Sequence, residues 1–265
     1  MENEFKKLAE FTGHDYNILT PRGNAAILIA LVIAKQLGKT KVYTPDQGGW
    51  FSFKTYPKIL GMDLELIKTD NGIIEKLDLD ENSALIYAQP AGYFAAQDMK
   101  DIYNKCKNKT LVIADVSGSV SDKEICKGEF ADIMVGSFSE WKPINIGYGG
   151  FISFKDKKYL EAGKEILTIS KTSPHLEKEL EDKLKTINER YKFFYNQAKT
   201  VKKDLSKYNI LHANKKGINV VIAFDSEKEK KEIIDYCNKQ KFEHTLCPRY
   251  IRVNRQAVSI EVKRL

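Results

Sequence analysis

Residues 136–150, GSFSEWKPINIGYGG, form the stretch around which the rest of the sequence is interpreted. Lys142 follows two serines, Ser137 and Ser139, and precedes a glycine-rich turn. Short apolar segments on both sides predict two strands, so the stretch is expected to be a loop with a flexible backbone. A lysine in such a loop can face a cavity, although a solvated surface lysine is the more common case. The choice depends on the rest of the chain.

Before this loop, short apolar segments alternate with segments of helical period. Strands are predicted at residues 41–44, 64–68, 84–88, 110–114, 133–135 and 151–154, and helices at 2–11, 25–37, 51–60 and 95–107. Strands that alternate with helices form βαβ units, so we expect an α/β fold with a mainly parallel sheet. Ligands of such sheets bind beyond the carboxyl ends of the strands. The segments at predicted strand ends, which should converge there, are 45–51, 89–94, 115–119 and 137–142.

The pattern changes after residue 154. Apolar residues recur every three or four positions over 174–205, which predicts one long helix with a narrow apolar stripe. Such a helix spans about 45 Å, enough to connect two domains, although a coiled-coil seam would show the same stripe. A small α+β domain is predicted from strands at 218–224, 250–253 and 258–262 and a helix at 228–240. We therefore predict a large domain of residues 1–170, with a helical arm at 1–13, and a second unit of residues 171–265.

The net charge is +7, and the excess of basic residues lies entirely in residues 155–265. Lysines alternate there with glutamates, which is typical of a solvated surface, so a nucleic-acid partner is not expected. No segment has the roughly 18 consecutive apolar residues of a membrane span, and the charged N-terminus lacks the apolar block of a signal peptide. The sequence thus predicts a cytoplasmic protein without membrane contact. Its four cysteines are scattered, with no spacing typical of a metal site or a disulfide framework.

Asp115 ends an apolar strand, LVIAD. Burial would raise the pKa of this carboxyl, so an ionised Asp115 needs a cationic partner. The protonated pyridine nitrogen of pyridoxal phosphate is one such partner, in enzymes whose lysine holds the cofactor as a Schiff base. Metal, nucleotide and structural sites also place an aspartate at a strand end, but Lys142, across the next strand, favours the first interpretation.

Gly23 and Asn24 precede the apolar helix predicted at 25–37. A glycine lets an anion approach the first backbone amides of a helix, where the positive end of the helix dipole favours a phosphate. A plain helix cap would have the same sequence.

At these positions the sequence resembles the fold-type-I pyridoxal-phosphate-dependent enzymes, and most closely the DegT/DnrJ/StrS sugar aminotransferases, whose lysine loop reads SFHxTKxxxTGEGG. The residues in the same register here are Ser137, Phe138, Lys142, Gly147, Gly149 and Gly150. The resemblance covers residues 20–154. It implies a three-layer α/β fold with a mainly parallel sheet and a small C-terminal α+β domain, and pyridoxal 5'-phosphate as the cofactor.

The resemblance also implies roles for single residues. Lys142 would be the Schiff-base lysine and Asp115 the partner of the pyridine nitrogen, which makes both catalytic. Ser137 would contact the cofactor phosphate, and Trp50, in preference to Phe51, would stack on the cofactor ring. The implied phosphate cup at the helix start is Gly23, Asn24 and Ala25.

Two positions depart from the family pattern. Ser139 stands where the family has a histidine, and we keep it among the cofactor-binding candidates. Gly118 stands where the family has a glutamine, three residues after the aspartate. We expect Gln89 to supply the polar contact to the ring hydroxyl instead.

These observations favour a pyridoxal-phosphate-dependent aminotransferase that moves an amino group between an amino acid and a keto substrate, with a keto sugar among the candidates. Lys142 would also shuttle the α-proton as general base. Two alternatives stay open. The first is another fold-type-I chemistry, such as a lyase or an aldolase, because the cofactor permits several reactions. The second is a noncatalytic scaffold that kept the fold.

The resemblance further implies a symmetric homodimer with the site near its interface. Tyr148 and Asn145 are then candidates to contact the substrate across that interface. Arg249 and Arg252 are candidates for a substrate carboxylate, because a guanidinium binds a carboxylate through two hydrogen bonds. No metal ligand is predicted.

Overall fold

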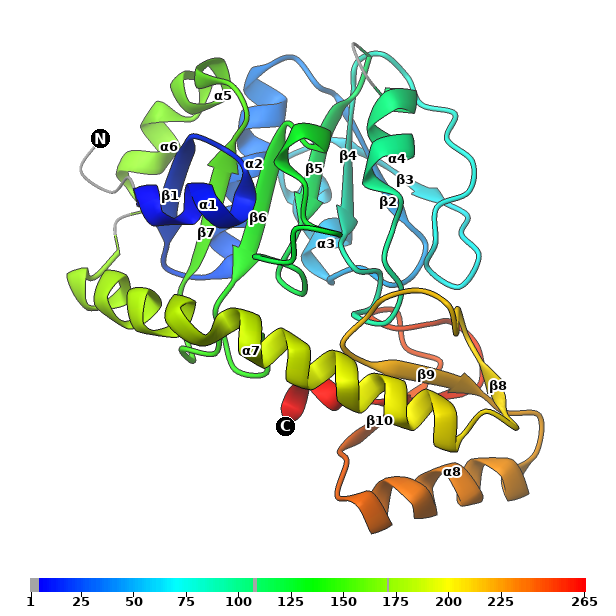
Figure 1. Ribbon diagram of the computed structural model, residues 1–265. Helices are drawn as coiled ribbons and strands as arrows, with labels where there is room; N and C mark the ends of the chain where they lie inside the picture. The colour runs from blue at the N-terminus through cyan, green and yellow to red at the C-terminus, as the bar shows by residue number, and fades with distance from the viewer. Residues whose placement is uncertain (1–4, 107–108, 171) are drawn as a thin grey trace.

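The computed structural model describes residues 5–106, 109–170 and 172–265, and it contains two sheets joined by a long helix (Figure 1). The larger sheet has seven strands in the order β1-β7-β6-β5-β4-β2-β3. They are β1 (Tyr16–Thr20), β2 (Lys41–Pro45), β3 (Asp63–Ile67), β4 (Ser83–Ala88), β5 (Leu111–Asp115), β6 (Ile133–Ser137) and β7 (Gly150–Phe154). The five adjacent strands β6, β5, β4, β2 and β3 run parallel to one another. β7 is antiparallel to both of its neighbours, β1 and β6.

Helices cover both faces of this sheet, because its central strands bury side chains on both sides. Ala84 and Ile86 of β4 belong to the core on the side of α2, and Leu85 and Tyr87 to the core on the opposite side. The first layer contains α2 (Gly23–Gln36), α3 (Ser52–Ile59), α5 (Lys157–Ala162) and α6 (Lys164–Thr168). The second contains η1 (Lys6–Leu8), α1 (Ala9–Thr12), α4 (Met99–Cys106) and α7 (Pro174–Asp204). This arrangement confirms the three-layer α/β prediction.

The helix α7 runs from the large sheet to the small one (Figure 1). Its predicted apolar stripe is buried, at Leu176, Leu180, Leu184, Ile187, Tyr191, Phe194, Ala198, Val201 and Leu205. The stripe shares a core with residues of both sheets in the same chain, which disfavours the coiled-coil alternative. Like every other helix in the described ranges, α7 is not apolar enough over a sufficient length to cross a bilayer. The cytoplasmic location stays a prediction.

The smaller sheet is antiparallel, in the order β10-β11-β9-β8. Its strands are β8 (Asn209–Ile210), β9 (Val220–Ala223), β10 (His244–Cys247) and β11 (Ala257–Ile260), and α8 (Glu227–Gln240) packs on it. These elements form the predicted C-terminal α+β unit. The division of the chain at residues 170 and 171 stays a prediction, and residue 171 lies outside the described residues.

Several elements differ from the sequence prediction. The prediction of a strand at 250–253 is wrong. The backbone turns there, with Arg252 N donating to Arg249 O at 2.8 Å. The strand of this region is β10, which ends before that turn. The N-terminal helix ends at Thr12, before Gly13 with φ of +73°, and residues 1–4 lie outside the described residues. The sequence did not predict β1, α5 or α6. In β1 the strand conformation is supported by pairing with β7, a contact that local sequence does not reveal.

A buried histidine, His14, connects the loop before β1 to Gly128 and to Ser153 of β7 by hydrogen bonds. His14 Nε2 lies 2.9 Å from Gly128 O, and His14 Nδ1 lies 3.1 Å from Ser153 Oγ. A carbonyl oxygen only accepts, so Nε2 carries the proton and Nδ1 accepts one from the serine hydroxyl. Burial lowers the pKa of His14, so the folded protein holds the neutral ring.

We predict that His14 makes the protein less stable in mild acid. Between about pH 7 and about pH 5.5 the unfolded chain takes up a proton that the folded one excludes, so the free energy of unfolding falls as the pH drops. Urea unfolding at both pH values should show a smaller fall for His14→Gln. The control is His175→Gln, at an exposed position, which should keep the wild-type pH dependence. An equal fall in all three proteins would contradict the prediction.

Candidate active site

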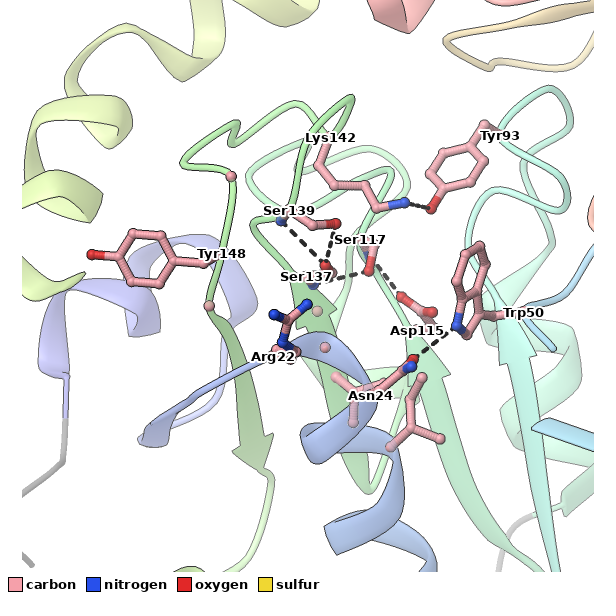
Figure 2. Close-up of a pocket in the computed structure, with 16 residues that line it drawn as sticks. Arg22, Asn24, Trp50, Tyr93, Asp115, Ser117, Ser137, Ser139, Lys142 and Tyr148 are labelled. Atoms are coloured by element: carbon pink, nitrogen blue, oxygen red, sulfur yellow. Dashed lines mark hydrogen bonds between the residues drawn. The ribbon is translucent and has the colours of Figure 1, made fainter. Parts of the chain in front are cut away.

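One pocket receives side chains from all four segments predicted to converge at the strand ends (Figure 2). Trp50 follows β2 and Tyr93 follows β4. Asp115 ends β5, and Lys142 lies in the loop after β6. Because β4, β5 and β6 are adjacent parallel strands, their carboxyl ends meet at the same edge of the sheet. The start of α2 completes the wall with Gly23 and its neighbours.

Asp115 is buried at the end of β5, and its Oδ1 accepts a hydrogen bond from Ser117 N at 2.9 Å. Burial raises the pKa of Asp115, and the charge of Lys142 opposes this rise. No ion pair within the described residues neutralises the carboxylate. A cationic group in the pocket would therefore stabilise its ionised form.

The lysine side chain points from its loop toward Tyr93 (Figure 2). Lys142 Nζ donates a hydrogen bond to the Tyr93 hydroxyl at 2.8 Å. The same nitrogen lies 5.4 Å from the centroid of the Trp50 ring. Lys142 is thus held at the pocket by a neutral partner rather than by a carboxylate, and its amine lies between two aromatic rings.

Trp50, rather than Phe51, contributes the aromatic ring to the pocket. Trp50 Nε1 donates to Asn24 Oδ1 at 2.8 Å, which orients the indole against the start of α2. Phe51 is 47% exposed and lies 6.0 Å from the Tyr250 ring centroid, outside the pocket. Trp50 thus lines the pocket and Phe51 does not, and the stacking of Trp50 on a cofactor ring stays a prediction.

One end of the pocket is rich in hydrogen-bond donors. Ser137 Oγ lies 2.9 Å from Ser139 Oγ and accepts from Ser139 N at 3.3 Å. A Cβ added at Gly23 would lie 2.5 Å from Ser137 Cβ, so only glycine allows the helix start to approach this serine. Arg22, which caps the helix start, also lines the pocket. Hydroxyls, a helix N-terminus and a guanidinium together suit an anion.

Pyridoxal phosphate fits these residues. The buried Asp115 carboxylate lacks a cation that a protonated pyridine nitrogen would provide, and the lysine amine opens into the same pocket. The glycine-dependent approach of α2 to Ser137 leaves a donor-rich end for a phosphate. Trp50 supplies a flat apolar surface beside them.

Three residues predicted to contact cofactor or substrate do not line the pocket: Gln89, Ala25 and Asn145. The Gln89 side chain is fully engaged elsewhere, since its Nε2 donates to Ile125 O at 2.7 Å and its Oε1 accepts from Gln97 N at 2.8 Å. Ala25 N donates to Arg22 O at 3.0 Å, inside the first turn of α2. These contacts give Gln89 and Ala25 structural roles.

The two arginines predicted to bind a substrate carboxylate also lie outside the pocket. Arg252 is 2% exposed, and its Nε donates to Glu261 Oε1 at 2.9 Å and its Nη1 to Ile251 O at 2.9 Å. Its guanidinium is therefore already paired with a carboxylate of the protein. Arg249 is exposed. By contrast Tyr148 lines the pocket, although its hydroxyl donates to Glu179 Oε1, away from Lys142 (Figure 2).

Among the polar residues that line the pocket, the sequence analysis did not single out Arg22, Tyr93 and Ser117. A signal for Tyr93 was present. Gly118 lacks a side chain where a Cβ would lie 2.7 Å from Tyr93 Cδ1, so the tyrosine ring takes the space that the family's glutamine would need. An aromatic residue at a neighbouring strand end was the natural candidate to fill it.

A mainly parallel sheet that presents a lysine loop and a buried aspartate at adjacent strand ends defines a fold-type-I pyridoxal-phosphate enzyme. The chain belongs to the DegT/DnrJ/EryC1/StrS aminotransferase family, whose family model matches residues 2–218. It is thus a pyridoxal-phosphate-dependent aminotransferase. A second family model, described as the MJ1341 family C-terminal domain, matches residues 188–265.

Solved structures share the fold at low sequence identity. PseC of Helicobacter pylori, an aminotransferase involved in the biosynthesis of pseudoaminic acid, is 16% identical with a TM-score of 0.73, over 96% of this chain and 83% of its own. 3-Amino-5-hydroxybenzoic acid synthase is 15% identical with a TM-score of 0.71, over 97% and 83%. A DegT DnrJ EryC1 StrS aminotransferase from Brucella abortus is 14% identical with a TM-score of 0.71, over 97% and 83%. Comparison with curated proteins gives no match.

We predict that Gly23→Ala weakens cofactor binding without unfolding the protein. The new Cβ would meet Ser137 Cβ at 2.5 Å, so the helix start and the serine must separate. We expect the dissociation constant of pyridoxal phosphate to rise by about tenfold or more, which corresponds to about 1.4 kcal/mol. Quenching of tryptophan fluorescence measures it, and thermal unfolding of the cofactor-free variant is the control. An unchanged dissociation constant would show that the close contact of Gly23 with Ser137 does not determine phosphate binding.

Proposed function

We propose that this enzyme transfers an amino group between an amino acid and a keto sugar through a Schiff base on Lys142. The observation that carries the proposal is that the Lys142 amine and the buried Asp115 carboxylate open into one pocket. The family match supports the reaction. The similar fold of PseC, whose product lies on the way to pseudoaminic acid, supports a sugar substrate.

The residues of the pocket divide the chemistry among them. When bound, pyridoxal phosphate supplies an electron sink for the electron pair left on the substrate α-carbon. Asp115 would keep the pyridine nitrogen protonated, which the sink requires. Lys142 Nζ would accept the α-proton and deliver it to the carbon on the other side of the transferred nitrogen. Trp50 would cover one face of the cofactor ring and exclude water from it.

The donor-rich end would hold the phosphate. Ser137 and Ser139 offer hydroxyls, the start of α2 at Gly23 and Asn24 offers backbone amides, and Arg22 adds a positive charge. A phosphate bound there would position the cofactor in the pocket that Lys142 lines.

We predict that Lys142→Ala and Asp115→Asn lose activity in different ways. Lys142→Ala should still bind pyridoxal phosphate but should not retain it after borohydride reduction, and turnover should fall by a factor of about 10³ or more. Asp115→Asn should keep the borohydride-fixed label on the lysine. Its turnover should fall about a hundredfold, because a loss of about two pKa units at the pyridine nitrogen corresponds to about 2.7 kcal/mol.

Mass spectrometry of the reduced protein and the release of keto acid from amino-acid donors measure these effects. The release of an aldehyde and a smaller amino acid would instead favour an aldolase. Wild-type turnover in Lys142→Ala, or a label on another lysine, would reject the proposed function.

We further propose that the enzyme is a homodimer with the lysine loop near its interface. Trp141 and Tyr148 flank Lys142 and are 41% and 37% exposed, which suits side chains that a partner subunit covers. Asn145, half-buried in the same loop, would lie at the same interface.

Light scattering should give a mass of about twice that of the chain, which is 30.3 kDa. Tyr148→Glu should shift the protein toward the monomer, because a carboxylate without a cationic partner is costly to bury against a partner subunit. A monomer that binds the cofactor at full occupancy would contradict the dimer proposal and leave the proposed reaction untouched.

A further inference from the structure

Tyr93 connects the small sheet to the lysine of the pocket. Its carbonyl accepts hydrogen bonds from Ile218 N at 2.8 Å and Asn219 N at 3.0 Å, at the start of β9. Its φ of +68° is unfavourable for a residue with a side chain, so these two bonds hold a strained backbone. Its hydroxyl accepts from Lys142 Nζ.

Two cations from the region of the small sheet lie against the Tyr93 ring. Lys263 Nζ is 5.0 Å and Arg252 Cζ is 5.3 Å from the ring centroid, and both side chains are almost fully buried. Glu261 pairs with both, since its Oε1 accepts from Arg252 Nε at 2.9 Å and its Oε2 lies 3.6 Å from Lys263 Nζ. We call Arg252, Glu261 and Lys263 the buried charge cluster.

Lys263 also contacts the backbone beside the catalytic lysine. Its Nζ donates to Trp141 O at 3.2 Å. Trp141 precedes Lys142 and has a φ of +63°, a second left-handed residue in this region. Arg264 Cζ lies 4.4 Å from the Trp141 ring centroid, so the ring is held from the same segment.

A lysine is rarely fully buried unless it is paired, and Lys263 is paired with Glu261. Burial lowers the pKa of Lys263 to about 7, in spite of the opposing charge of Glu261. Burying the Lys263 ammonium therefore costs free energy, although the residue does not line the pocket. The contacts of Lys263 with Trp141 and Tyr93 offer a reason for its burial. Trp141 precedes Lys142 in the loop, and the Tyr93 hydroxyl accepts a hydrogen bond from Lys142 Nζ.

We propose that Lys263 is a positioning residue for the amino-transfer reaction: it holds the Trp141 backbone and the Tyr93 ring, and so aims Lys142 Nζ into the pocket. The inference rests on the proposed function, in which Lys142 carries the cofactor. In this proposal the position of Lys142 Nζ depends on Lys263, in the segment that follows β11. Lys263 itself does not line the pocket.

The test compares Lys263→Met with Lys202→Met. Methionine keeps the length and apolar stem of lysine but removes its donor. Lys202 is the control, because its side chain is half-buried and its Nζ likewise donates to backbone carbonyls, Ala213 O at 3.0 Å and Lys215 O at 2.7 Å, but away from the pocket. Both variants should remain folded, which urea unfolding checks.

The first measurement is hydrogen exchange of the cofactor-free protein. In Lys263→Met, amides of residues 138–147 should exchange about tenfold faster than in the wild type, because the loop has lost its anchor at Trp141. In Lys202→Met this peptide should exchange at the wild-type rate. Equal exchange in the two variants would overturn the inference.

The second measurement uses the loaded enzyme. Lys263→Met should bind pyridoxal phosphate but have a smaller fraction fixed by borohydride, and kcat should fall about tenfold or more while KM for the amino donor changes less. Tyr93→Phe, which removes the hydroxyl partner of Lys142, should lower the fixed fraction in the same direction. If the wild-type label were on another lysine, the proposed function would fail. If it were on Lys142 and Lys263→Met behaved as Lys202→Met, only the positioning role would fail.

Discussion

The buried carboxylate of Asp115 is the constraint on which the arrangement of the site depends. It ends β5, between β4 and β6, and accepts a hydrogen bond from Ser117 N at the floor of the pocket. Burial raises its pKa, so the carboxylate persists as an anion only where a cation lies against it. Because the neighbouring strand is β6, the loop with Lys142 begins directly beside this carboxylate. Sheet order thus brings the amine and the acid to one pocket before any specific side-chain contact is made.

The return of the chain from β6 into β7 explains the glycines around the lysine loop. A Cβ at Gly150 would lie 2.5 Å from Gly136 O and 2.7 Å from Gly23 N. The two antiparallel strands and the start of α2 therefore meet backbone to backbone. This close packing places Ser137 against the helix start, and so the anion end of the pocket is built from segments that are far apart in the sequence. The loop sequence that first suggested the site is also the one that allows this packing.

Local patterns predicted the central parallel strands because β4, β5 and β6 are short runs of mostly apolar residues, as in LVIAD. They failed where a tertiary contact overrides the pattern. Residues 250–253, YIRV, are rich in strand-forming residue types, but the backbone turns there while Arg252 is paired with Glu261. Tyr93 escaped notice for a related reason. Its place depends on the room that Gly118 leaves, and the sequence shows this glycine but not which neighbouring side chain fills the space. The sequence could indicate that Lys142 and Asp115 meet in one pocket, because both lie at the carboxyl ends of neighbouring strands. Their catalytic roles stay a prediction.

The two buried carboxylates Asp115 and Glu261 differ in their ion pairing, and only Asp115 lines the pocket. Burial raises the pKa of Asp115, for which no ion pair is formed by the described residues. Burial alone would do the same to Glu261, but the charges of Arg252 and Lys263 hold its pKa well below the ordinary value. Glu261 is thus satisfied within the protein, and Arg252 is not free to bind a substrate. Asp115 forms no such ion pair within the described residues and faces the pocket, so a cation bound there would stabilise its ionised form.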